Sequence, residues 1–76
     1  MKYYLDCIEQ VTTEEGGYNE YGSREKKADY QTALTAFYTK LTNVSNSKSH
    51  VWLDIKIVNS QGGVEKKDSI GRYVEG

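Results

Sequence analysis

One segment of this chain has a helical repeat, and it limits the fold more than any other feature. Its apolar side chains recur at i, i+3, i+4, i+7, i+8 and i+11, namely Tyr30, Ala33, Leu34, Phe37, Tyr38 and Leu41. Ser23 is a suitable N-cap and the turn-forming run "TNVSNSKS" follows, which predicts a helix over about residues 24–43. One helix of this length can cover only one face of a small sheet.

Three further segments are expected to be strands. The stretch "HVWLDIKIV" has a branched aliphatic residue at every second position, which predicts a strand over about residues 50–59. "KYYLDCIEQV" alternates in the same way over about residues 2–11. A turn at 59–63 leads to a weaker, charged strand over about residues 64–74, in which Gly71 marks a bulge or the end of regular pairing. Residues 12–22, "TTEEGGYNEYG", are expected to be a polar loop.

These elements predict a single α+β domain over residues 1–76, with the order β-α-β-β and one amphipathic helix packed on one face of a three-stranded sheet. The favoured strand order places 50–59 between the other two strands, and the alternative places 64–74 in the centre. The predicted core combines side chains from the helix and the two apolar strands: Tyr3, Leu5, Cys7, Ala33, Leu34, Phe37, Leu41, Val51, Leu53, Ile55 and Ile57.

The second face of this sheet has no helix left to cover it. An apolar strip among charges on a small domain is typical of an interaction surface, and Trp and Tyr often dominate binding energy. The residues predicted to form this surface are Trp52, Tyr4, Ile8, Val58, Asp54 and Lys56. Two other arrangements stay open for Trp52, which could lie across its own neighbours or be covered by Tyr18 and Tyr21.

Few residues suited to catalysis or metal binding are present. Cys7 is the single cysteine and falls at a core position, and His50 is the single histidine, at the start of a strand. Glu14 and Glu15 are adjacent in a loop, where they do not converge as a catalytic or metal-binding pair must. We therefore expect no enzymatic activity, no cofactor and no metal.

Charge and hydropathy narrow the choice of partner. The net charge of −1 gives no strong field for nucleic acid, and Asp6 and Asp54 lie beside the aromatic residues of the uncovered face. The N-terminus is too short and too polar for a signal peptide, and no apolar run has the length of a transmembrane helix. The expected location is the cytoplasm.

The segments "MKYYLDCIEQV", "AFYTKLTNV" and "HVWLDIKIVNSQGGVEKKDSIGRYVEG" together resemble a group of small proteins from gut Gram-positive bacteria, their prophages and their integrative elements. The resemblance implies no activity and no catalytic residues. It implies a protein that acts stoichiometrically, by binding another macromolecule.

The sequence therefore predicts a small non-enzymatic interaction protein. We expect it to form a homodimer through the uncovered sheet face and to bind a protein partner, as a phage or mobile-element accessory or inhibitor. The alternative is a nucleic-acid-associated accessory factor that uses the aromatic residues of the same face.

Overall fold

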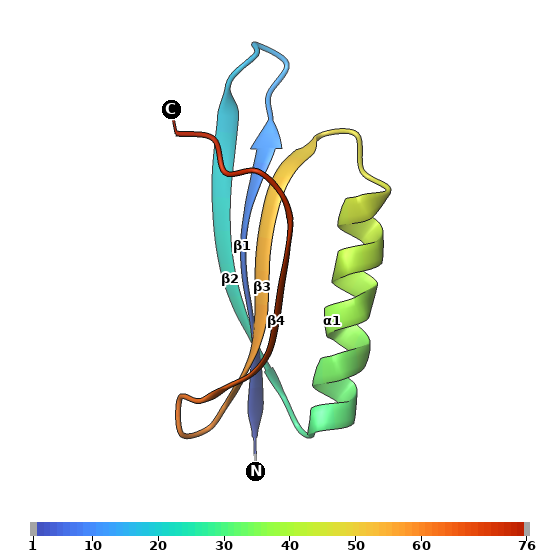
Figure 1. Cartoon of the computed structure of the whole chain (residues 1–76), viewed down its shortest axis with the longest axis vertical. Coiled ribbons are helices and arrows are strands. Elements are labelled where there is room, and N and C mark those ends of the chain that lie inside the picture. The colour runs from blue at the N-terminus through green and yellow to red at the C-terminus, as the bar shows by residue number, and fades with distance from the viewer. Residues whose placement is uncertain (1, 76) are drawn as a thin grey trace.

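The computed structural model describes residues 2–75. Along the chain the elements are β1 (Tyr3–Thr12), β2 (Tyr18–Lys27), α1 (Tyr30–Ser45), β3 (His50–Asn59) and β4 (Val64–Gly71). The four strands form one antiparallel sheet in the order β2-β1-β3-β4. The helix lies along one side of this sheet, and the other side has no helix (Figure 1).

The predicted three-stranded β-α-β-β fold is wrong, because the segment expected to be a loop and the start of a helix is a strand. β2 pairs with β1 over ten residues. Ser23, the predicted N-cap, lies inside β2. The N-cap is Asp29, whose carboxylate accepts a hydrogen bond from the backbone N–H of Thr32 at 2.7 Å. The helix therefore starts six residues later than predicted and ends at Ser45.

The sequence of β2, "YNEYGSREKK", has no alternation of apolar and polar residues because the strand is exposed. Every residue from Tyr18 to Lys26 is exposed, so neither side of β2 requires apolar side chains. A strand that buries nothing has no hydrophobic period of two. Glu, Arg and Lys at its end are good helix formers, which favours the helical interpretation from sequence.

The inserted strand β2 changes how the helix connects the strands of the sheet. β2 and β3 both run antiparallel to β1, so they are parallel to each other, and α1 connects them across β1. β3 lies between β1 and β4, which is the favoured neighbour order of the three predicted strands. Its bounds, His50–Asn59, are those expected from the sequence.

The core lies between α1 and the two central strands. Its buried members are Leu5, Cys7, Ala33, Phe37, Val44, Leu53, Ile55 and Ile57, with Tyr3, Tyr30, Leu34, Ala36, Leu41 and Ile70 packed against them. Ten of the eleven predicted core residues are therefore buried or packed against the buried cluster: Tyr3, Leu5, Cys7, Ala33, Leu34, Phe37, Leu41, Leu53, Ile55 and Ile57. Val51 lies at a register shift between β1 and β3 and is only half-buried.

Strand register separates the two faces of the sheet. Odd-numbered residues of β1 and β3, such as Leu5 and Ile57, pair with each other under the helix. Even-numbered residues of the same strands share the opposite side, because successive side chains of a strand alternate. We call this side the open face: Tyr4, Asp6, Ile8, Gln10, Trp52, Asp54, Lys56 and Val58, with Gly22 and Arg24 of β2.

The chain leaves β4 at Gly71, three residues before the predicted end of this strand. Gly71 has a φ of 78°, and a Cβ atom there would lie 2.1 Å from the carbonyl oxygen of Val51. Only glycine fits this left-handed turn beside a neighbouring backbone. Residues 72–75, which we call the C-terminal strap, then cross the sheet toward β2 (Figure 1).

Candidate interaction surface

The six residues predicted to form an interaction surface all lie on the open face, but their exposure differs. Ile8, Asp54 and Lys56 are exposed. Tyr4 and Trp52 are half-buried. Val58 is buried at 5 % exposure, between its cross-strand neighbours Tyr4 and Val64, so the prediction that it is a contact residue is not supported by its accessibility.

Tyr4 is partly covered by an ion pair. Arg24 donates from Nε and Nη2 to the two carboxylate oxygens of Asp6, at 2.7 and 2.6 Å. Its guanidinium carbon lies 4.9 Å from the centre of the Tyr4 ring. The hydrogen bond from Arg24 lowers the pKa of Asp6 below its ordinary value, since it stabilises the charged form. The planar fork of Arg24 thus joins β1 and β2 on the open face.

Trp52 is covered from one side by the C-terminal strap. The ring of Tyr73 meets it edge to face, with ring centres 4.8 Å apart. Gln10, which is 4 % exposed, holds the strap through the backbone of Val74. A hydrogen bond with the Glu20 carboxylate raises the pKa of Tyr73. The sequence did not predict a role for three residues of this site, Gln10, Glu20 and Tyr73. Contacts between polar residues far apart in the chain produce no repeating pattern in the sequence.

Tyr18 and Tyr21 do not provide this cover. Both belong to β2, and both are about half exposed. The alternative in which they bury Trp52 is therefore wrong, and the strap takes the place that was considered for them.

The centre of the open face remains uncovered around Ile8. Its partners in the neighbouring strands are Gly22 on one side and Asp54 on the other, so no large side chain adjoins it across the sheet. Ile8 is 44 % exposed. A shallow hollow of about 250 Å³ lies here, and it is lined by Asp6, Cys7, Ile8, Gly22, Ser23, Asp54 and Lys56. An aliphatic side chain in a hollow with a charged rim is suited to contact another apolar surface.

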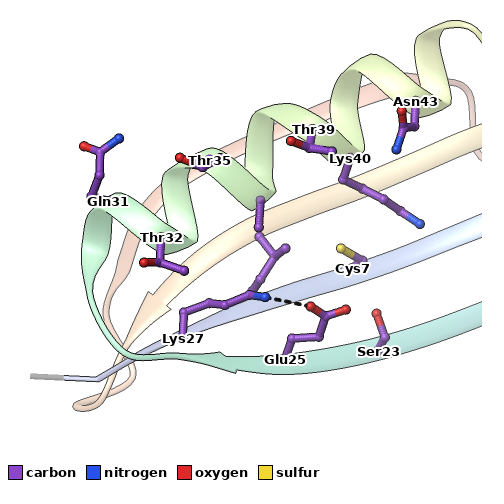
Figure 2. Close-up of a pocket in the computed structure, with 12 residues that line it drawn as sticks. Cys7, Ser23, Glu25, Lys27, Gln31, Thr32, Thr35, Thr39, Lys40 and Asn43 are labelled. Carbon is purple, nitrogen blue, oxygen red and sulfur yellow. Dashed lines mark ion pairs between the residues drawn. The ribbon is translucent and has the colours of Figure 1, made fainter.

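A second depression lies on the other side of the sheet, between α1 and β2 (Figure 2). This groove has a volume of about 550 Å³. Its lining includes Thr32 and Lys40 of the helix and Glu25 and Lys27 of β2. Glu25 and Lys27 form an ion pair of 3.0 Å. The groove exists because α1 lies over β1 and β3 and leaves β2 uncovered (Figure 1).

Cys7 lies at the floor of the groove on β1. Burial raises the pKa of its thiol, since desolvation disfavours the thiolate. Only the thiolate is a good nucleophile, so at neutral pH Cys7 is suited to packing and not to covalent chemistry.

The single histidine belongs to a polar chain that resembles a catalytic triad. Glu9 accepts from His50 Nε2 at 2.9 Å and from Lys40 at 2.7 Å, and His50 Nδ1 lies 2.8 Å from Ser47 Oγ. Ser47, however, follows the C-terminal end of α1, where the helix dipole is negative and opposes an oxyanion. Its own backbone N–H donates to Val44. The chain of hydrogen bonds links α1, β1 and β3.

No group of three or more metal-binding side chains is found among residues 2–75. Within the same residues no helix is long and apolar enough to cross a membrane. No family model, curated protein or solved structure matches this chain.

Proposed function

We propose that this chain is a non-enzymatic interaction protein that forms a homodimer through its open face. The observation that carries the proposal is the exposure of Ile8 in the middle of that face, beside Gly22 and Asp54. Burying an aliphatic side chain of this size contributes about 1.5–3 kcal/mol. The strap narrows the face at the Trp52 end and leaves its centre uncovered.

Charge on the open face supports a second copy as the occupant. Asp54 and Lys56 are two residues apart on β3, so both project from the same side and both are exposed. In a two-fold interface each surface meets itself, so an acid and a base side by side can pair reciprocally with the same residues of the partner. The net charge of −1 adds little repulsion between copies.

The aromatic residues of this face favour a protein surface over nucleic acid. Base stacking needs a free ring face, and the ring of Tyr4 is occupied by Arg24. Trp52 is engaged with Tyr73. The ion pair with Asp6 also leaves Arg24 less able to bind a phosphate backbone. Binding of a further protein partner, and a role as a phage or mobile-element accessory or inhibitor, stay predictions from the sequence.

Sedimentation velocity over a concentration series tests the homodimer. We expect wild type to self-associate at concentrations on the order of 100 μM or below, and Ile8→Glu to associate at least about tenfold more weakly, because the substitution would bury two unpaired carboxylates at the open-face interface. Tyr38→Glu is the matched control, since Tyr38 is also about half exposed but lies on the helix. A wild type that stays monomeric at 1 mM, or an Ile8→Glu variant that dimerises like wild type, would contradict the proposal.

A further inference from the structure

The two edges of the sheet differ in how well they are closed to further pairing. β4 has a register shift between Ile57 and Val58 of its partner strand and ends at the left-handed Gly71. Such irregularities interrupt the row of backbone groups that another strand would need. β2 pairs with β1 residue for residue from Tyr18 to Lys27, with no shift. It therefore presents a regular edge of ten residues.

This edge is also exposed, although the C-terminal strap contacts β2 where Tyr73 meets Glu20. Each residue from Tyr18 to Lys26 is exposed, and the helix lies over the central strands and not over β2 (Figure 1). Every second residue of an edge strand directs its N–H and C=O away from the sheet, where only water or a further strand can satisfy them. We propose that the occupant of the β2 edge is β2 of a second copy, aligned antiparallel.

The order of charges along β2 is complementary to itself. When two copies are aligned antiparallel with Gly22 opposite Gly22, Glu20 of each lies opposite Arg24 of the other, and Tyr18 lies opposite Lys26. Opposite charges directly across a strand pair are favourable, and a two-fold axis makes each pair occur twice. Arg24 uses Nε and Nη2 for Asp6, so its Nη1 remains to bind the partner's carboxylate.

Gly22 suits the two-fold position in this alignment. Its φ lies in the ordinary range, and it adds no side chain that could clash with its copy on the same face of the sheet at the two-fold axis. Charges at the flanking positions restrict pairing to a strand with the matching order, whereas an apolar edge would pair with many partners. The product is a continuous eight-stranded sheet with both helices on one side, because residues of equal parity face each other.

This edge interface is distinct from the open-face interface proposed above, and amide hydrogen exchange separates the two in unmodified protein. The edge interface predicts that alternate backbone amides of Tyr18–Lys27 exchange at least about tenfold more slowly at high than at low protein concentration. Amides of β4 should show no such change. An open-face dimer alone leaves the outward amides of β2 in water, so concentration-independent exchange along β2 overturns the edge inference and leaves the proposed function standing.

A charge exchange tests the alignment. Glu20→Arg and Arg24→Glu each place like charges opposite each other in a homodimer, and each should weaken edge association by at least about tenfold. An equimolar mixture restores both opposite-charge pairs, so heterodimers should form, as native mass spectrometry can measure. Both variants are made with Ile8→Glu, which removes the open-face contact. Glu14→Arg, with the same change of charge in the exposed β1–β2 turn, is the control.

Rescue by mixing is the deciding result, because Glu20 and Arg24 also have partners within the chain. Loss of the contact of Glu20 with Tyr73, or of Arg24 with Asp6, weakens each variant alone and is not repaired by adding the other variant. Recovery of association in the mixture supports the alignment. Absence of recovery while both variants remain folded by circular dichroism overturns it.

Discussion

Gln10 binds the backbone of Val74 through both ends of its side-chain amide. Nε2 donates to the Val74 carbonyl at 2.8 Å, and the Val74 N–H donates to Oε1 at 2.8 Å. The two residues are 64 positions apart in the chain. This pair of hydrogen bonds fixes the C-terminal strap across the open face and satisfies a buried amide that would otherwise destabilise the fold.

Removal of this contact should release the strap. Gln10→Ala is expected to lower the free energy of unfolding by about 1–3 kcal/mol, because a buried paired amide is lost. Trp52 is the single tryptophan, so its fluorescence should shift to longer wavelength as Tyr73 leaves it. Urea denaturation and emission spectra measure both effects. Gln61→Ala, in the exposed β3–β4 turn, should change neither.

Gly71, at the turn that starts the strap, is required both by its positive φ and by the neighbouring backbone. Gly62, in the β3–β4 turn, has a positive φ but no such neighbour, so substituting both glycines separates the two effects. Gly62→Ala, at a φ of 88° with no atom within 4 Å of the added Cβ, should cost about 1–2 kcal/mol from backbone strain alone. Gly71→Ala adds a collision with the Val51 carbonyl and should cost clearly more, at least about 3 kcal/mol. Thermal denaturation gives the comparison. Equal destabilisation by the two variants would mean that the β3–β4 edge relaxes freely.

The position of the helix start can be tested with two small substitutions. Asp29→Ala should lower the free energy of unfolding by about 1 kcal/mol, because it removes the acceptor for the Thr32 N–H. Ser23→Ala should have less effect, since Ser23 lies within a strand whose side chains are exposed. Urea denaturation distinguishes the two. A larger loss from Ser23→Ala would place the N-cap where the sequence alone suggested it.

Acid should destabilise the protein through three carboxylates. For Glu9, desolvation by burial raises the pKa, but hydrogen bonds from Lys40 and His50 outweigh it, and the net pKa is lowered. The pKa values of Asp6 and Asp29 are lowered by hydrogen bonds from Arg24 and Thr32. A lowered folded-state pKa stabilises the fold above the unfolded-state pKa and loses that contribution as the pH falls through the folded value.

The expected result is a free energy of unfolding that declines from about pH 5 downward. Glu9→Gln should reduce the slope of this decline, because the side chain no longer titrates. Urea denaturation at a series of pH values measures the slope. A stability that is constant down to about pH 3 would show that these three carboxylates have the same pKa in the folded and unfolded chain.

The parts of the fold that bury apolar side chains were predictable from the sequence. β3 has a branched aliphatic residue at every second position, and its observed bounds equal the predicted ones. Ala33, Phe37 and Leu41 pack where the helical period placed them. In both elements the pattern of side chains follows directly from the geometry of one buried face.

The parts of the fold that lie at the surface or depend on contacts between distant residues could not be predicted from the sequence. β2 is exposed along nearly its whole length, so its sequence carries no trace of a buried side. The strap depends on Gln10 meeting a backbone 64 residues away, and a contact to the backbone places no demand on which residue occupies position 74. Gly71 was the one local signal at this site: it was predicted to mark a bulge or the end of regular pairing, and β4 ends there, three residues before the predicted end of the strand.

Intermolecular nuclear Overhauser effects test the central claim, self-association through the open face, most directly. The sample is an equimolar mixture of ¹³C-labelled and unlabelled protein, so that only contacts between copies are observed. We predict contacts from the methyl groups of Ile8 to protons of the partner's open face. A mixture that self-associates but shows no intermolecular contact from Ile8, or one that shows none at all at 1 mM, would contradict the claim.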